Sequence, residues 1–200
     1  MKSKVFSGLV FASLFTFFNC SGPVKQSDNV EIKPAKSELS EKELVARGKY
    51  LTTIGGCNDC HSPKVMTPLG PGPDTTRLLS GHPQNEKLSK IINTQDWILF
   101  NNGATAFVGP WGVSYAANLT PDETGIGNWN FEQFVTAIRK GKSKGLEGSR
   151  PLLPPMPWQM YQVMTDEDLK AVFTYLKSLP AIINRVPDPI APNHLISQSK

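Results

Sequence analysis

Residues 55–61 read Gly-Gly-Cys-Asn-Asp-Cys-His, and this stretch constrains the fold more than any other. Cys57 and Cys60 are three positions apart, so both thiols lie on one turn of chain and can form thioethers with the two vinyl groups of one porphyrin. His61 then lies under the iron as its proximal nitrogen ligand. The two preceding glycines allow the backbone to approach the macrocycle closely. The pattern therefore predicts covalent attachment of haem.

Two other kinds of site share part of this pattern. A thioredoxin-like redox pair should follow a strand in a βαβ unit, whereas the segment before Cys57 and Cys60 is predicted to be an amphipathic helix. A zinc site needs further ligands, and the sequence contains no second C-x-x-C and no H-x-x-x-H. Because C-x-x-C-H occurs once, we expect one covalently attached haem c with its iron.

The bulk composition limits the class of protein. The chain has 200 residues, of which 39% are hydrophobic and 19% charged, which is enough for one domain with a buried core. The net charge of +4 is spread along the chain without a basic block, so we expect no nucleic-acid partner. Three cysteines cannot all pair within one molecule, and a disulfide scaffold is not predicted.

The N-terminus has the pattern of an export signal. Lys2 and Lys4 precede an uncharged run from Val5 to Phe18, which is shorter than the roughly 20 residues that a membrane-spanning helix needs. Cys20 follows this run, as in a bacterial lipoprotein signal whose cysteine becomes acylated. The bulky residues 17–19 depart from the small residues usual at that place, and ordinary cleavage or an uncleaved anchor remain alternatives. In each case we expect the domain on the periplasmic or cell-surface side.

These patterns predict four segments. Residues 1–19 are expected to form the signal, and residues 20–39 a polar, flexible tether that holds the protein to the membrane through lipidated Cys20. Residues 40–184 are expected to form the folded domain, and residues 185–200 a C-terminal tail.

Three amphipathic helices are predicted. The first begins at Ser40, which forms a capping box with Glu43 and precedes a face that includes Gly48. The second runs from Asn130 to about Lys140, and the third from Thr165 to Ser178.

A further short helix or two is expected among the apolar residues between Leu88 and Phe100, which include Ile91, Ile92 and Trp97. No strand-like alternation of useful length occurs, and the 17 prolines and 16 glycines favour loops. The predicted fold class is all-α with long loops.

The second axial ligand is predicted to be Met156. It lies in the stretch Arg150 to Trp158, where four prolines stiffen the chain and Pro157 biases Met156 toward an extended conformation. A methionine ligand raises the potential of a carrier haem. The competing candidates are Met160, Met164 and, for a bis-histidine haem, His82 or His194, whereas Met66 is too close to the motif. Both histidines are expected to be solvated loop residues.

Beyond the motif, the sequence resembles the class I cytochrome c family, and in particular the cytochrome subunits of bacterial membrane-associated dehydrogenases. The matching pieces are residues 46–51, 57–61, 79–81, 117–122, 124–127, 129, 155–158 and 175–176. The resemblance implies a helical fold in which the first and last helices cross near Gly48 and Tyr175. It also implies His61 and Met156 as axial ligands, and a haem edge along residues 115–129. Those subunits often carry several haem domains, whereas this chain has one motif.

Two classes of function follow from these predictions. An electron carrier has both axial positions filled and exchanges electrons with a dehydrogenase, a respiratory complex or an oxidase. A haem enzyme or ligand sensor needs an open or displaceable sixth position. The predicted methionine ligand favours the electron carrier, with no catalytic residue.

Overall fold

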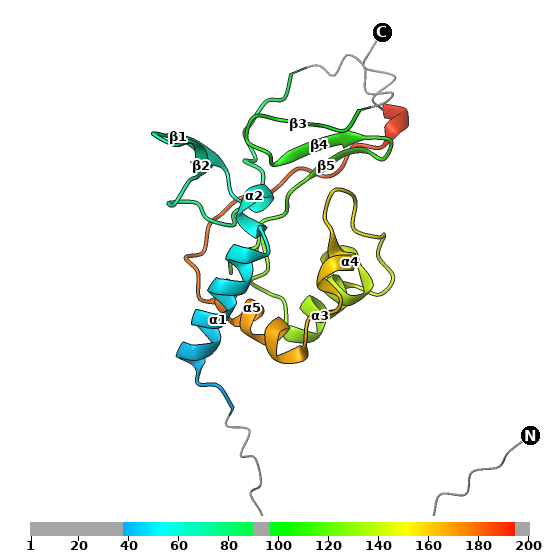
Figure 1. The fold of residues 1–200 in the computed structure, drawn as a ribbon. Coiled ribbons are helices and arrows are strands. Elements are labelled where there is room, and N and C mark those ends of the chain that lie inside the picture. The colour runs from blue at the N-terminus through cyan, green and yellow to red at the C-terminus, as the bar shows by residue number, and fades with distance from the viewer. Residues whose placement is uncertain (1–37, 90–96, 195–200) are drawn as a thin grey trace, which may run out of the picture. The chain divides into compact units, whose positions relative to one another are not determined.

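The computed structural model describes residues 38–89 and 97–194. Figure 1 shows the order and arrangement of its elements. The helices are α1 (Glu41–Ile54), α2 (Cys57–His61), α3 (Phe131–Lys140), the 3-10 helix η1 (Ser143–Gly145), α4 (Trp158–Tyr161) and α5 (Asp166–Lys177). The strands are β1 (Lys64–Thr67), β2 (Gly70–Pro73), β3 (Leu99–Phe100), β4 (Ala106–Gly109) and β5 (Gly112–Tyr115).

The three long helices begin where their capping residues predict. Ser40 forms a capping box with Glu43 at the start of α1, and Asn130 forms one with Gln133 at the start of α3. The side chain of Thr165 accepts a hydrogen bond from the backbone N–H of Asp168 at the start of α5. The three predicted helices are therefore confirmed.

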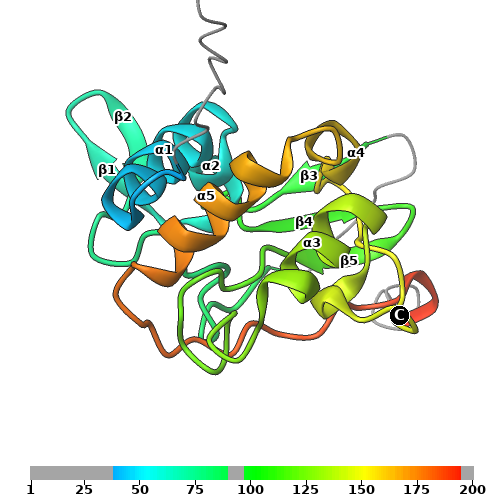
Figure 2. The ribbon, with the colours of Figure 1, turned by 90° about the horizontal axis from the view of Figure 1, so that it is seen from below.

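Helices α1 and α5 cross closely, as Figures 1 and 2 show. A Cβ atom on Gly48 would overlap the carbonyl of Ala171 and the Cβ of Tyr175, so only glycine permits this approach. Arg47 and Asp168 join the two helices at their exposed side, with 2.5 Å between Nε and Oδ1. The predicted crossing near Gly48 and Tyr175 is confirmed.

The core of the domain lies beside this crossing. It joins α5 and α3 to two loop residues, one before and one after the three-stranded sheet. Its buried members are Leu79, Ile126, Phe134, Leu169, Val172, Tyr175 and Leu176. Because these side chains come from widely separated parts of the sequence, their burial fixes the loops as well as the helices.

The prediction of an all-α fold is wrong, since the domain also contains two small antiparallel sheets. Strands β1 and β2 form a hairpin, and β3, β4 and β5 form a three-stranded sheet in that order. All four residues of β4 are buried, so the strand lacks the alternation that a half-exposed strand would show. The turn before β5 depends on Gly112, whose φ of 96° favours glycine.

The short helix expected near Trp97 and Phe100 is also absent. Leu99 and Phe100 form β3 and pair with Val108 and Phe107 of β4. Leu88 lies outside any helix or strand, whereas Ile91 and Ile92 fall outside the described residues. Pairing with β4 therefore decides the local conformation here.

The segment after α5 returns across the molecule to the sheet. Val113 of β5 and Ile190 exchange two backbone hydrogen bonds of 2.8 and 3.0 Å. Strand β5 is therefore paired along both edges at Val113, with β4 on one side and Ile190 on the other.

The expected signal, Cys20 and nearly all of the expected tether lie outside the described residues, as do residues 195–200. No helix within residues 38–89 and 97–194 has the length and apolarity needed to cross a bilayer.

Candidate haem-binding site

The two motif cysteines lie on helix α2, which occupies a single short turn after α1. Gly56 has a φ of 68°, a left-handed conformation that lets the chain end α1 and begin α2 at once. Cys57, Cys60 and His61 are thereby placed on one helical segment.

The imidazole of His61 is oriented by a backbone carbonyl. Its Nδ1 lies 2.8 Å from the oxygen of Ala117. Because a carbonyl oxygen only accepts, Nδ1 carries the proton and Nε2 keeps its lone pair. Burial lowers the pKa of His61 and favours the neutral ring. A neutral imidazole with a free Nε2 and an anchored Nδ1–H is the usual form of a histidine metal ligand.

The carbonyl that orients His61 is itself held in place. The side chain of Asn118 donates to the oxygen of Ile182 at 2.9 Å and accepts from the backbone N–H of Thr120 at 2.9 Å. The N–H of Gly81 donates to the carbonyl of His61 at 2.7 Å, and Gly81 lies so close to residues 116 and 117 that a Cβ would overlap them. Three separate stretches of the sequence therefore meet at His61.

The two thiols are partly buried and less acidic than free cysteine side chains. Burial raises the pKa of Cys57 to about 11, and burial followed by the charge of Asp59 raises that of Cys60. Thioredoxin-like cysteines have lowered pKa values instead. No group of three or more His, Cys, Asp or Glu side chains suited to a metal ion occurs in the described part of the chain. The raised pKa values thus differ from those of a thioredoxin-like redox pair.

A lysine caps the C-terminal end of α2. The Nζ atom of Lys64 lies 3.0 Å from the carbonyl oxygen of Asn58, 2.9 Å from that of Asp59 and 2.6 Å from that of Ser62. Three converging carbonyls hold this ammonium group beside the motif, where it compensates the negative end of the helix. The sequence analysis did not predict this role for Lys64. Its position three residues after His61, just past the motif, is the feature that could have indicated it.

The stretch that carries Met156 leads from η1 to α4. Its first part is joined to α3, because the N–H of Leu152 donates to the carbonyl of Gly141 at 2.6 Å. Trp158 packs so closely on Gly141 that a Cβ there would overlap the indole. Tyr161, five residues after Met156, donates its hydroxyl proton to the carbonyl of Gly55 at 2.5 Å. The Met156 stretch therefore returns to the residues directly before the motif.

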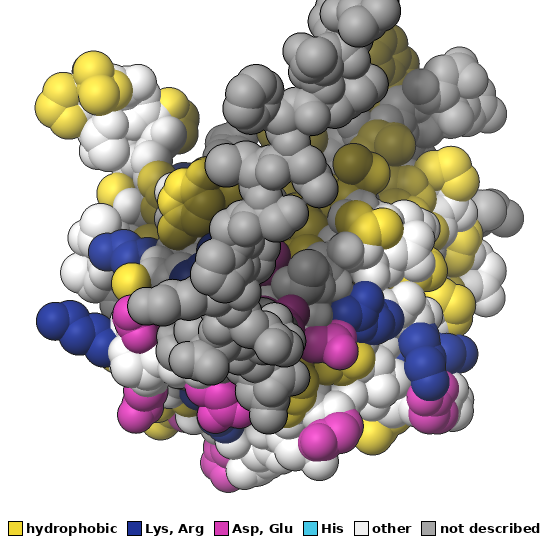
Figure 3. Space-filling view, turned by 60° about the horizontal axis from the view of Figure 1, so that its bottom comes forward, with side chains coloured by type: hydrophobic (Ala, Val, Ile, Leu, Met, Phe, Trp, Pro, Cys, Tyr) yellow, Lys and Arg dark blue, Asp and Glu magenta, His cyan; other side chains and the backbone are white. Residues whose placement is uncertain are grey.

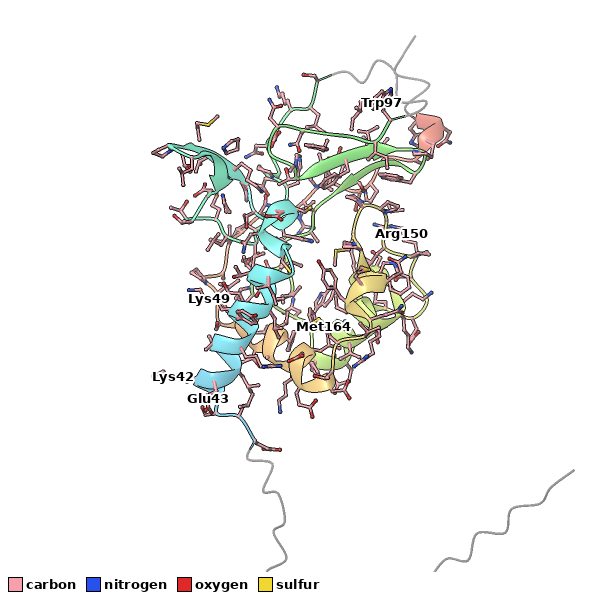
Figure 4. All side chains as sticks on the ribbon, in the orientation of Figure 1. Lys42, Glu43, Lys49, Trp97, Arg150 and Met164 are labelled. Atoms are coloured by element: carbon pink, nitrogen blue, oxygen red, sulfur yellow. The ribbon has the colours of Figure 1, made fainter. Side chains whose placement is uncertain are left out.

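The other methionines occupy different environments. Met156 is half-buried, whereas Met160 is 72% exposed and Met66, on β1, is 80% exposed. Met164 packs against the core, and Figure 4 labels its side chain between the helices. Packing therefore already accounts for Met164.

The expectation that His82 is solvated is wrong. The residue is fully buried, with Nδ1 2.9 Å from Oγ1 of Thr105 and its ring 4.9 Å from that of Tyr115. Its Nε2 has no hydrogen-bond partner among the described residues. The three-stranded sheet covers this histidine, which the loop sequence around it did not reveal. His194 is exposed, as expected.

The residues match what a covalent haem requires of its protein. Two thiols on one helical turn suit thioether attachment, and the anchored His61 offers one nitrogen ligand. These features together define a c-type cytochrome domain as the class of protein that the site fits.

Comparison with known proteins agrees with this class. The chain is 32% identical over 133 residues, or 66% of its length, to the gluconate 2-dehydrogenase cytochrome c subunit of Pantoea cypripedii. It is 27% identical over 86% of its length to the fructose dehydrogenase cytochrome subunit of Gluconobacter japonicus. It is 26% identical over 80% of its length to the cytochrome c subunit of the quinone alcohol dehydrogenase of Gluconobacter oxydans. No family model matches the sequence.

The chain spans only 22% to 28% of the length of these three relatives. Over that part the chain is similar to the cytochrome subunits of bacterial dehydrogenases.

Proposed function

We propose that the chain is an exported, single-haem electron carrier with a class I cytochrome c fold. In this proposal haem c is attached to Cys57 and Cys60, and its iron is ligated by His61 and Met156. When bound, the haem supplies reversible one-electron chemistry. The observation that carries the proposal is the hydrogen bond between Nδ1 of His61 and the carbonyl of Ala117, which prepares Nε2 as a ligand.

His61 would bind the iron without changing its protonation. Its Nδ1–H is committed to Ala117 and burial disfavours a second proton, so Nε2 stays available over the neutral pH range. The hydrogen bond to Ala117 holds the ring, and the hydrogen bonds of Asn118 and Gly81 hold the backbone on either side of it. Such fixed geometry suits an electron carrier, which should reorganise little between its oxidation states.

Met156 is the proposed second ligand because its stretch is tied to the end of α3 and leads into α4, whose Tyr161 reaches Gly55 just before the motif. The contacts at Leu152 and Tyr161 lie on either side of it. A thioether held on a proline-rich stretch fills the sixth position and excludes small exogenous ligands. This arrangement favours electron transfer over the haem enzyme or ligand sensor.

The partners are proposed from the names of the relatives, which are dehydrogenase cytochrome subunits. We expect the chain to accept electrons from an exported dehydrogenase and to pass them to a respiratory complex or an oxidase. Basic and acidic side chains both lie on the face shown in Figure 3, so this face is not the uniformly basic surface that nucleic acid would need. Lipidation at Cys20 would hold the protein at the membrane.

The first experiment is expression of the exported protein with cytochrome c maturation, followed by spectra of both oxidation states. We expect haem that survives denaturing electrophoresis, together with the long-wavelength absorption band of methionine-ligated ferric haem. Absence of covalent haem would overturn the site assignment. Covalent haem without the methionine band would overturn Met156 alone.

Two variants separate the possible sixth ligands. Met156→Ala should remove the methionine band, lower the reduction potential and allow the reduced protein to bind carbon monoxide. His82→Phe should leave the band unchanged, because His82 is proposed only as a packing residue. A different set of results would indicate a histidine-ligated haem: a wild type without the methionine band, an unchanged potential in Met156→Ala, and carbon monoxide binding only in His82→Phe. The unpartnered Nε2 of His82 is the available donor for such a haem.

A further inference from the structure

The Met156 stretch depends on outside contacts for its conformation. Four of the residues from Pro151 to Pro157 are prolines, which have no N–H to donate. Within this stretch the N–H of Met156 reaches the carbonyl of Leu153 at 3.3 Å, a long hydrogen bond. Figure 4 labels Arg150 where this stretch begins, between the three-stranded sheet and α4. Donors on neighbouring elements therefore matter for holding Met156.

Ser114 of β5 supplies such a donor. Its hydroxyl donates to the carbonyl oxygen of Pro154, two residues before Met156, at 2.6 Å. The same oxygen atom of Ser114 accepts from Nε1–H of Trp111 at 3.1 Å. The Trp111 bond occupies a lone pair of Ser114 and directs its proton toward Pro154.

The strand that carries Ser114 is a rigid support. Ser114 is 6% exposed and pairs with Phe107 of β4. Its neighbour Val113 is fixed on the opposite edge by the two hydrogen bonds to Ile190. A buried hydroxyl on a strand paired along both edges has little freedom to follow a moving loop.

We propose that Ser114, oriented by Trp111, is a positioning residue that holds the Met156 stretch in its ligating conformation. This inference rests on the proposed function, in which Met156 ligates the iron. It gives the three-stranded sheet a role in the site: the sheet would hold the stretch that carries the proposed second ligand. The Ser114–Pro154 bond then favours the methionine-bound state over states in which an added ligand takes its place.

The expected effect follows from the loss of one partner of a part-buried hydrogen bond. In Ser114→Ala the Pro154 carbonyl loses its donor, which shifts a conformational equilibrium by about tenfold. An exogenous ligand binds only to protein in which Met156 has left the iron. The apparent affinity of that ligand therefore rises by the same factor as the fraction of protein in this state.

The test is a titration of the ferric holoprotein with imidazole, read from the loss of the methionine band. Ser114→Ala should bind imidazole about tenfold more tightly than the wild type. Ser114→Thr keeps the hydroxyl and should bind as the wild type does. Trp111→Phe removes the N–H that orients Ser114 and should give a smaller increase.

Ser80→Ala is the matched control. Ser80 is 1% exposed and its hydroxyl also donates to a backbone carbonyl, that of Arg77, at 2.8 Å. This control should leave imidazole affinity unchanged, whatever its effect on thermal unfolding. Equal affinities for Ser114→Ala and the wild type would overturn the inference, as would equal increases in Ser114→Ala and Ser80→Ala. A wild type that lacks the methionine band would instead overturn the proposed ligand.

Discussion

Replacement of Gly48 by alanine is expected to loosen the crossing of α1 and α5. The added Cβ would overlap the carbonyl of Ala171, which is backbone and cannot rotate away, and also the Cβ of Tyr175. The two helices must therefore separate. Separation weakens the contacts of Tyr175 and Leu176, which belong to the buried core.

The magnitude can be worked from two opposing effects. Overpacking in a close contact costs about 1–3 kcal/mol, and a clash against backbone belongs at or above the upper end of that range. Alanine gains about 1 kcal/mol over glycine in a helix interior. We therefore expect the free energy of unfolding to fall by roughly 2–3 kcal/mol, or the midpoint temperature by about 4–12 °C.

The assay is thermal and urea unfolding of Gly48→Ala beside the wild type, both as holoprotein. Gly148→Ala is the control, because a Cβ at Gly148 would have no atom within 4 Å. The control should unfold within about 0.5 kcal/mol of the wild type. If Gly48→Ala were as stable as the wild type, the close approach of the two helices would not be what demands glycine.

Three further predictions concern the charge and the titration of the site. Lys64→Met should lower the reduction potential by on the order of tens of millivolts, because the ammonium beside the motif disfavours the more positive ferric state. Lys42→Met is the control, and this change at the far end of α1 in Figure 4 should leave the potential unchanged. In haem-free protein, the rate at which Cys57 reacts with iodoacetamide should rise with pH around a midpoint near its pKa of about 11. In urea-unfolded protein the midpoint should be well below this value. Equal midpoints in the two states would contradict the effect of burial. Burial lowers the pKa of His82, with a smaller opposing effect from Glu86. The contribution of neutral His82 to the free energy of unfolding is therefore complete above the pKa of the unfolded protein. It is lost as the pH falls through the lower pKa of the folded protein. The unfolding midpoint of His82→Asn should therefore fall less than that of the wild type between pH 7 and pH 5, and an equal fall would refute this.

Local chemistry made much of the fold predictable. The capping residues Ser40, Asn130 and Thr165 each satisfy free N–H groups within their own helix, so their effect is readable from neighbouring positions. Gly48 was readable as well, because a glycine on an apolar helical face costs helix stability and is typical of a close contact with a second helix. The motif at 57–61 is equally local, because its geometry depends on one turn of helix.

The strands and the environment of His82 were not readable in this way. A strand buried on both faces shows no alternation, and β4 is such a strand. Whether a histidine in a loop is solvated depends on what covers it. His82 is covered by Tyr115 of the same sheet and by Thr105, the residue directly before β4. Once the sheet is missed, the burial of His82 is missed with it.

The order of residues alone predicts where a haem attaches, which histidine ligates it and which helices enclose it. How these groups are held depends on contacts between distant parts of the folded chain. Ala117 orients His61 through a backbone carbonyl, and Ser114 reaches the Met156 stretch through another, at Pro154. Every residue carries a backbone carbonyl, so these two leave no trace in the order of side chains. Their roles arise only when folding brings a particular donor within hydrogen-bond distance.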